Sequence, residues 1–301
     1  MAVIRKKTWG DRVFNIITYT VFTLLTLACV LPFYYIIINT ISDNQLVATG
    51  QILIYPKGLH FENYLNALKL DRLPRAFLIS LSRVVLGTGF VVICASFPGY
   101  AFTRREFWHR KFFYRFMISA MYINAGVIPV FLAYKTLGLY NNYWVYILPG
   151  IVSPFNMILC KTYIESIPAA LEESAQIDGA GYFVRYTRIV LPLAVPILAT
   201  INIFTAVGHW NSFMDTVLYI INERYYTLQY VLYQYLNEAD AVQEIVRNNP
   251  DALSGRDLST LLTPLTVRYT VSVITIVPIL LVYPFFQRYF VKGIMIGAVK
   301  G

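Results

Sequence analysis

The richest group of polar side chains within the apolar parts of this 301-residue chain stands at His209, Trp210, Asn211 and Asp215. Polar groups are costly in an apolar segment and usually face a cavity there. Sugars carry hydroxyl groups at their edges and apolar C–H patches on their faces, so an indole ring beside an amide and a carboxylate suits them. Asn211 and Asp215 are one helical turn apart and would share a helix face. This group is therefore a candidate for lining a substrate path, and its chemistry would suit a sugar.

Two further polar side chains inside apolar runs, Asn124 and Asn156, are candidates for the same path. A second interpretation stays open for two of the first group, because Trp210 would also serve as an anchor at the membrane surface and Asn211 as a hydrogen-bonding group between helices. Arg83 lies near the outer end of an apolar run, where a long side chain can reach water, so we expect no site there.

The sequence gives no sign of an enzyme or of a bound cofactor. The histidines His60, His109 and His209 lie far apart and lack the spacing of metal ligands, so we expect no metal site. The GxxxxGK[ST] pattern of a phosphate-binding loop does not occur, so any ATP must be bound by another chain. The apolar runs also lack a cluster of acidic, His or Ser groups at one depth, which a membrane-embedded enzyme would need.

The elements that carry these residues are membrane spans by composition. Hydrophobic residues make up 57% of the chain and charged residues only 14%, and the mean hydropathy is +0.55. These values exclude an ordinary water-soluble domain and favour a polytopic membrane protein. The net charge of +9 comes from basic residues beside apolar runs, where membrane topology places them, so we expect no binding to nucleic acid.

Six apolar runs reach the length of about 20 residues that a helix needs to cross the hydrocarbon core. They are Phe14–Ile38, Phe77–Phe102, Phe112–Tyr134, Tyr143–Tyr163, Leu191–Ile221 and Val267–Tyr289. The first run is too long for the apolar region of a signal peptide and has no small-residue cleavage site at its end, so we expect it to be retained. The sequence therefore predicts an all-α fold with six transmembrane helices.

Clusters of Lys and Arg predict the orientation of these spans. They are Arg5, Lys6, Lys7 and Arg12 before the first span, Arg104, Arg105, Arg110 and Lys111 in the second connection, and Arg288, Lys292 and Lys300 after the last span. Basic residues mark the cytoplasmic side, so we expect both termini and residues 165–190 in the cytoplasm. Residues 39–75 and 222–266 then face outward, and the aromatic stretch 225–235 predicts a helix lying on the interface.

The cytoplasmic segment Glu173–Pro192 is polar and cannot sit in hydrocarbon, so it must be a loop with order of its own. The residues that follow Pro168 favour a helix, with proline in its first turn. Gly179 and Gly181 then break that helix, and a second short helix leads back to the membrane. We expect a rigid knob made of helix, glycine corner and helix, which a partner outside the membrane grips.

This loop resembles the signature loop of the permease subunits of binding-protein-dependent ABC importers. Glu173-Ser174-Ala175, Gly179, Ile189 and Leu191-Pro192 have the family's spacing, with Ser174 where the family usually has Ala. Asp178-Gly179-Ala180 and Leu191–Pro196 resemble the carbohydrate branch, as in the second permease subunit of the maltose transporter and in importers of pectin- or alginate-type oligosaccharides. The resemblance extends over nearly the whole chain through Gly126–Pro129, Leu137–Leu139, Trp210-Asn211 and Tyr283–Gly293.

The resemblance implies a type I ABC importer permease fold and a passive role driven by a separate ATPase. In this family the loop is a coupling helix that docks into a cleft of the cytoplasmic ATPase, whose ATP-driven closure swings the membrane helices. It implies that the ATPase is contacted through the loop by Glu173, Ser174, Ala175, Asp178, Gly179 and Ala180, and through the carboxyl-terminal tail by Gly297, Val299 and Lys300. The alternatives are a loop without a partner, in which Glu172 and Glu173 are merely solvated, and a frayed tail.

The resemblance also implies the organisation and the partners of the chain. We expect one permease domain over 1–301, with an importer core at about 77–290, the coupling loop at 165–190, an extracytoplasmic segment at 222–266 and a cytoplasmic tail at 291–301. The implied partners are a second homologous permease, an ATPase dimer that binds ATP and Mg, an extracellular solute-binding protein and an oligosaccharide, all at a bacterial plasma membrane. The alternative is an independent secondary transporter of a small polar solute, which would need inverted repeats and intramembrane charge pairs, and the sequence shows neither clearly.

Overall fold

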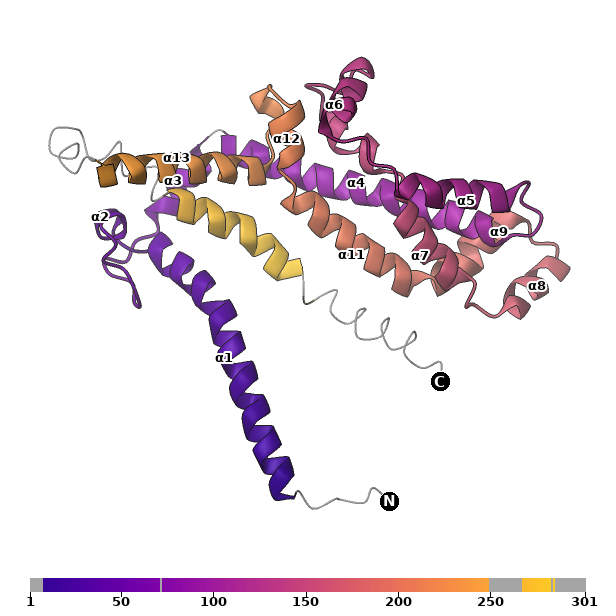
Figure 1. Ribbon diagram of the computed structural model, residues 1–301, viewed down its shortest axis with the longest axis horizontal. Helices are drawn as coiled ribbons and strands as arrows, with labels where there is room; N and C mark the ends of the chain where they lie inside the picture. The colour runs from indigo at the N-terminus through magenta and orange to yellow at the C-terminus, as the bar shows by residue number, and fades with distance from the viewer. Residues whose placement is uncertain (1–7, 71, 249–266, 283, 285–301) are drawn as a thin grey trace. The chain divides into compact units, whose positions relative to one another are not determined.

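All of the regular structure in the described part of the chain is helical, which confirms the predicted all-α fold (Figure 1). The computed structural model describes residues 8–70, 72–248, 267–282 and 284, and no strand occurs among them. The chain divides into two compact units. One unit holds residues 1–69 and 235–274, and the other holds residues 70–234 and 275–301.

The helices follow one another with short connections along most of the described chain. They are α1 (Trp9–Thr40), α2 (Asn44–Ala48), α3 (Glu62–Lys69), α4 (Arg72–Thr103), α5 (Arg110–Met121), α6 (Val127–Thr136), η1 (Tyr143–Tyr146), η2 (Leu148–Gly150), α7 (Pro154–Ile164), α8 (Ala169–Ile177), α9 (Tyr182–Arg185), η3 (Tyr186–Val190), α10 (Leu191–Leu193), α11 (Val195–Asn211), α12 (Met214–Tyr219), η4 (Glu223–Tyr225), α13 (Leu228–Asn248) and a further helix Val267–Val282. The turns η1, η2 and η4 are 3₁₀ helices, and η3 is a π-helix.

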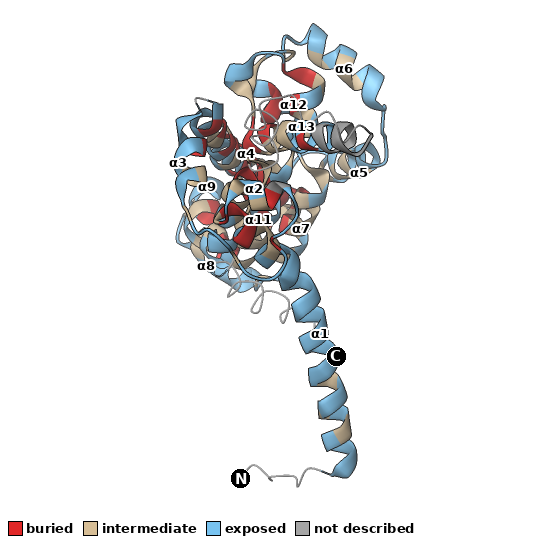
Figure 2. Ribbon diagram, turned by 90° about the vertical axis from the view of Figure 1, so that its left-hand side faces the viewer, coloured by how far each residue is buried: buried red, intermediate tan, exposed pale blue. Residues whose placement is uncertain are grey.

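Helix α1 in the first unit is apolar and exposed along most of its length (Figure 2). Its start is fixed by a capping box, in which Thr8 Oγ1 accepts a hydrogen bond from the backbone N–H of Asp11 at 3.3 Å and the Asp11 carboxylate accepts one from Thr8 N at 2.8 Å. Only 6% of its most apolar stretch is buried inside the chain, and buried residues begin at Ile38. Such a surface is suited to lipid, as a membrane span requires.

Helix α4 in the second unit packs along both α7 and α11. Two of its glycines allow this close approach, since a Cβ atom at Gly99 would lie 2.8 Å from Cβ of Cys160 and one at Gly87 would lie 2.4 Å from Nε2 of His209. Small residues at helix crossings are typical of membrane proteins, where close packing replaces the hydrophobic effect. Figure 2 shows buried residues on α4 and α11, so α4 is the helix around which this unit is built.

The main core of the second unit joins α4 to the segment that returns from the predicted cytoplasmic loop. Its buried members are Val91, Ala95, Tyr100, Phe102, Met157, Cys160, Ile164, Tyr186, Val190 and Ile201. Tyr186 and Val190 belong to the π-helical turn η3, which follows the loop directly. The loop is therefore anchored directly to the core.

Among the described residues, two helices, α1 and α4, are long and apolar enough to cross a membrane. Two more spans result if each bent pair counts as one span, namely Tyr143–Gly150 with Pro154–Ile164, bent by 44°, and Tyr182–Leu193 with Val195–Asn211, bent by 76°. The first two predicted spans are thus confirmed as continuous helices. The count of six spans stays a prediction.

The prediction of one continuous helix over residues 112–134 is wrong. Helix α5 ends at Met121 and α6 begins at Val127. Between them Asn124 Oδ1 accepts a hydrogen bond from the backbone N–H of Gly126 at 2.9 Å, and Gly126 has φ +80°. This local turn satisfies a backbone group that a helix would otherwise satisfy, so hydropathy alone does not reveal the break.

The fourth and fifth predicted spans are also interrupted. The Ser153 side chain accepts a hydrogen bond from the backbone N–H of Asn156 at 3.3 Å and so starts α7 afresh after the 3₁₀ turns η1 and η2. In the fifth run α10 ends at Leu193 and α11 begins at Val195 with proline at its start, where the 76° bend falls. Both breaks occur beside proline, which ends or bends a helix even in apolar sequence.

Candidate functional site

The predicted cytoplasmic loop has the expected form of helix, glycine corner and helix. Helix α8 begins just after Pro168 and ends at Ile177, with Asp178 as its C-cap, and Gly179 follows with φ +81°. The backbone N–H of Ala180 donates to the carbonyl of Ala175 at 2.9 Å, and that of Gly179 donates to Gln176 at 3.1 Å. This pair of hydrogen bonds forms a Schellman C-cap, which needs a residue in the left-handed conformation at the corner. The predicted role of glycine at 179 in the corner is therefore confirmed by the backbone.

The second glycine of the corner behaves differently from the expectation. Gly181 stands at the start of α9 with φ −69°, a value that any residue adopts, and a Cβ atom there would meet nothing within 4 Å. The first glycine alone turns the chain. The sequence pattern could not separate the two, because a glycine beside a helix end fits either a left-handed cap or an ordinary helix start.

Helix α8 has one face turned into the protein and one turned away from it. Glu172 is 7% exposed, whereas its neighbour Glu173 is exposed and Ile177 is 87% exposed. The carboxylate of Glu172 pairs with Arg104, whose Nη1 lies 2.6 Å from Oε2, and it accepts a hydrogen bond from the hydroxyl of Tyr100 at 3.2 Å. The interpretation of Glu172 as a solvated side chain is therefore wrong. Its partners lie about 70 residues earlier, so no local pattern reveals them.

The two arms of the loop are also tied to each other. Arg185 on α9 is buried, and its Nη1 donates to Oε1 of Gln176 on α8 at 2.9 Å. The guanidinium carbon lies 4.4 Å from the ring centroid of Tyr182, a cation–π contact. The hydrogen bond to Gln176 crosses the glycine corner and the contact with Tyr182 orients Arg185 for it, so the loop is a braced unit.

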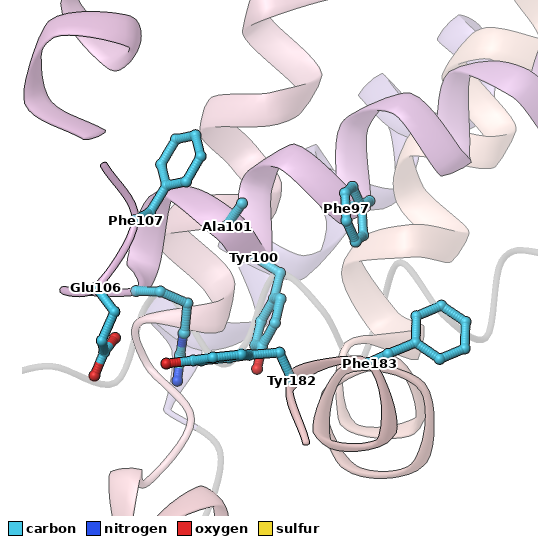
Figure 3. A pocket seen from close by; sticks show the side chains of 8 residues that line it. Phe97, Tyr100, Ala101, Glu106, Phe107, Tyr182 and Phe183 are labelled. Atoms are coloured by element: carbon cyan, nitrogen blue, oxygen red, sulfur yellow. The ribbon is translucent and has the colours of Figure 1, made fainter. Parts of the chain in front are cut away.

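An apolar cavity of about 370 Å³ lies between the end of α4 and the start of the returning segment. Figure 3 shows Phe97, Tyr100 and Ala101 on α4 and Tyr182 on α9 among its lining side chains. A polar cleft of about 520 Å³ shares Arg104 with this cavity, and Glu172 and Glu173 both line it. Aromatic side chains line the cavity between the loop and α4, and charged side chains line the cleft beside it.

The predicted sugar-contact residues near the end of the fifth run do not share one helix face. Helix α11 ends at Asn211, and Asp215 lies on the separate helix α12, so the prediction that the two share a face is wrong. Trp210 is buried, and its Nε1 donates to the carbonyl of Thr275 at 3.0 Å. Asn211 is exposed and accepts a hydrogen bond from Gln229 at 3.1 Å through Oδ1. Trp210 is therefore a packing residue, and Asn211 stays open to solvent or a ligand.

Asp215 forms an ion pair with Arg83 of α4 inside the second unit. Arg83 is 3% exposed, donates to the carbonyl of Ser212 at 3.1 Å and lies over the ring of Tyr146 at 4.7 Å. The second carboxylate oxygen of Asp215 accepts a hydrogen bond from Ser212 Oγ at 2.5 Å. The expectation that Arg83 reaches toward water is therefore wrong, because a carboxylate from another helix pairs with it within the protein.

The remaining predicted path residues lie apart from this group in the hydrogen-bond network. Asn124 is exposed and is occupied in the turn before Gly126, and Asn156 is half-buried in the first turn of α7. Within the described residues neither shares a hydrogen bond with Trp210, Asn211 or Asp215.

Two further groups of predictions concern the tail and metal ligands. The tail residues Gly297, Val299 and Lys300 lie outside the described residues. In the part of the chain that the structure describes, no group of three or more His, Cys, Asp or Glu side chains could hold a metal ion.

Known proteins share both the sequence and the fold of this chain. The family model of the binding-protein-dependent transport system inner membrane component matches residues 87–296. The polygalacturonan/rhamnogalacturonan transport system permease protein YtcP of Bacillus subtilis is 32% identical and covers 97% of this chain and 99% of its own length. Protein LplC of the same organism is 34% identical over 90% of each chain.

A solved transporter structure has the same fold as this chain. A chain in the crystal structure of a bacterial ABC transporter involved in the import of the acidic polysaccharide alginate superposes with a TM-score of 0.82 and 29% sequence identity, covering 94% of this chain and 98% of that one. The family match spans more than half of the sequence and includes the whole braced loop. This chain therefore belongs to the family of inner membrane components of binding-protein-dependent transport systems, as its loop motif predicts.

Proposed function

We propose that this protein is the transmembrane permease subunit of an ATP-driven importer. With a second homologous permease it forms the path for an oligosaccharide that an extracellular solute-binding protein delivers. ATP and Mg are bound by a separate ATPase dimer in the cytoplasm, and this chain carries out no chemistry of its own. The protein spans the plasma membrane as one permease domain, with both termini and residues 165–190 in the cytoplasm.

The observation that carries this proposal is the two-sided environment of helix α8. A loop that only connects two spans has no need of a buried ion pair on one face and an exposed apolar tip on the other. Glu173 and Ile177 are exposed on a helix whose opposite face is held by Arg104. Such a helix offers a rigid, ready-made surface to a partner in the cytoplasm.

The exposed residues of the loop have separate roles in this proposal. Glu173 pairs with a basic residue of the ATPase, and the small side chain of Ala175 permits close approach. Ser174 fits the same surface, because its hydroxyl donates to the carbonyl of Ala170 at 2.9 Å and so leaves no polar group unpaired. Asp178, Gly179 and Ala180 form the corner that sets the angle of the second arm.

The carboxyl-terminal tail supplies a second contact to the ATPase in this proposal. Gly297, Val299 and Lys300 combine two small or apolar side chains with one cation. Small residues fit a narrow slot between two ATPase subunits.

The substrate class follows from the relatives and the fold neighbour. YtcP is a polygalacturonan/rhamnogalacturonan permease, and the solved neighbour imports alginate. We therefore place the substrate among oligosaccharides of plant or algal polysaccharides. Asn124, Asn156 and Asn211 are the proposed contacts along the path, whereas Trp210 and Asp215 support the path from within the protein.

One observation favours a secondary transporter instead, namely the ion pair of Arg83 and Asp215. Intramembrane charge pairs often belong to ion-coupled transport. Here both carboxylate oxygens of Asp215 are occupied, one by Arg83 and one by Ser212. Such a pair fixes the packing of the fold without a coupling ion, and the family match over residues 87–296 supports a binding-protein-dependent importer, so the ATP-driven importer is the better proposal.

The experiment is uptake of labelled oligogalacturonides and alginate oligosaccharides by proteoliposomes that contain the complex purified from its native membrane with its binding protein. We expect accumulation only when ATP is present on the side of the ATPase. Accumulation that follows an ion gradient and does not need ATP would establish the secondary transporter.

A further inference from the structure

The two adjacent carboxylates of the loop have opposite surroundings. Glu173 is exposed and makes no side-chain hydrogen bond or ion pair within the described residues. Glu172 is almost fully buried between Arg104 and Tyr100. Because a buried carboxylate without a partner is strongly destabilising, Glu172 commits α8 to one position against α4.

The cluster that receives Glu172 is built by the end of α4. The hydroxyl of Tyr100 donates to Glu172, and the guanidinium carbon of Arg104 lies 4.6 Å from the centroid of the Tyr100 ring. Arg104 Nε donates in turn to Oγ1 of Thr103 at 2.9 Å. The arginine is thus held by a ring, a hydroxyl and a carboxylate together, which fixes its orientation.

The same turns of α4 also hold the other arm of the loop. The hydroxyl of Tyr186 in η3 forms a hydrogen bond with Ser96 Oγ at 2.8 Å. Its ring centroid lies 5.4 Å from that of Tyr100 and 5.5 Å from that of Phe97. Tyr100 therefore touches both arms of the loop, one through its hydroxyl and one through its ring.

Helix α4 is not a neighbour of the loop in the sequence, yet it is the helix against which α7 and α11 pack. The chain links α8 directly only to α7 and α9. Without the ion pair, a displacement of α8 would be transmitted to α4 only through these flanking helices. With the ion pair present, α8 is joined directly to Tyr100 and Arg104 at the end of α4.

We propose that Glu172 is a positioning residue that clamps the coupling loop to α4 through Arg104 and Tyr100, and so delivers the motion of the ATPase to the central helix of the permease. This clamp rests on the proposed function, in which the ATPase pushes on the exposed face of α8. Glu172 itself faces the permease and makes no contact with the ATPase.

The test compares transport with ATP hydrolysis in the purified complex. Glu172→Gln keeps the shape of the side chain and removes its charge, and we expect uptake per ATP hydrolysed to fall by about tenfold, a typical size for a coupling free energy. The amount of ATPase that purifies with the permease stays unchanged, because the exposed face is intact. Glu106→Gln, which neutralises an exposed carboxylate that lines the same polar cleft, serves as the matched control and behaves as wild type.

A double variant separates the clamp from a general loss of stability. If Glu172 acts through Arg104, then Arg104→Gln shows the same loss, and the pair Glu172→Gln with Arg104→Gln loses no more than the larger single loss. Losses that multiply in the double variant would overturn the clamp. Loss of the ATPase from the purified Glu172→Gln complex would also overturn it, by placing Glu172 in docking.

Hydrogen–deuterium exchange on the complex measures how firmly α8 is held, and it does not depend on transport. We expect the amides of α8 to exchange faster in Glu172→Gln than in wild type, while those of α13 are unchanged. Unchanged exchange in α8, or unchanged uptake per ATP, counts against the clamp. If the wild-type complex itself shows no ATP-driven uptake, the proposed importer fails, and the exchange of α8 still decides whether Glu172 holds the loop.

Discussion

Two ion pairs with largely buried partners tie α4 and the residue that follows it to other elements, and they differ in their surroundings. Arg83 meets Asp215 in a closed network, in which Ser212 and Tyr146 complete the surroundings. Arg104 meets Glu172 at the other end of the helix, on a short helix whose far face is exposed. The first pair is surrounded by other groups of the protein, whereas the second holds a helix whose far face is on the surface.

One type of interaction therefore serves two purposes in this protein. Burying an ion pair requires the desolvation of both charges, so the pair adds little net stability. Any conformation that separates the two buried charges is strongly destabilised. Around Arg83 this property fixes the position of Asp215 on α12 relative to α4. Around Arg104 it fixes a loop against α4 and leaves the outward face of that loop for a partner.

The largest expected effect comes from breaking the closed pair. Arg83→Met leaves the carboxylate of Asp215 without its cation, and loss of one partner of a buried pair costs about 3–5 kcal/mol. We expect a marked fall in the thermal unfolding midpoint of the detergent-solubilised protein. Arg83→Met combined with Asp215→Asn should recover part of the loss, because no charge is then left alone. A single variant as stable as wild type would show that the pair is not closed.

The next effect concerns the corner that shapes the exposed face. Gly179→Pro cannot adopt φ +81° and loses the backbone N–H that bonds to Gln176, at a cost of about 3 kcal/mol within the loop. We expect normal membrane insertion but no uptake, measured by surface labelling and by transport. Gly181→Ala is the matched control, since φ −69° suits alanine and its Cβ has free space. Uptake at the wild-type rate in Gly179→Pro would contradict the importance of the corner.

A smaller effect tests the packing that joins the two regions. A Cβ atom at Gly99 would lie 3.2 Å from the backbone N of Lys161 as well as close to Cys160, so Gly99→Ala must push α7 away at a cost of about 1–3 kcal/mol. Gly89→Ala on the same helix meets nothing and serves as the control. The unfolding midpoints of the two variants should differ clearly. Equal midpoints would show that α4 and α7 are not in close contact at this position.

The smallest effect is expected from an exposed ion pair at the start of α4. Arg72 and Glu223 lie 3.1 Å apart with 59% and 55% of their side chains exposed, so solvent and salt screen their attraction. Glu223→Gln should change the free energy of unfolding by about 0–1 kcal/mol. A loss as large as that of Arg83→Met would remove the distinction between closed and exposed pairs.

The sequence was sufficient for features that depend on local chemistry. Hydropathy predicts α1 and α4 as spans, and the glycine at 179 with the helix formers before it predicts the corner. Hydropathy failed where a local hydrogen bond or a proline interrupts an apolar run, as at Asn124 and Ser153. Apolar residues on both sides of such a break give the same average as a continuous helix.

The sequence was insufficient for pairings between distant residues. Arg83 lies 132 residues before Asp215, and Arg104 lies 68 residues before Glu172, so neither pair follows from spacing. Each arginine has an ordinary explanation by itself, one as a side chain near a span end and the other as a cytoplasmic charge. Only the folded structure, which brings Asp215 of α12 to Arg83 and Glu172 of α8 to Arg104, shows which carboxylate each arginine meets.

The central claim is that motion enters this protein through the exposed face of α8, and uptake by proteoliposomes tests it most directly. The complex purified from its native membrane should accumulate oligosaccharide when ATP is supplied. The same complex with Glu173→Lys, which reverses one exposed charge and touches no span, should insert normally and accumulate almost none. Wild-type uptake by the Glu173→Lys complex, or accumulation against a gradient by the purified chain alone, would contradict the account.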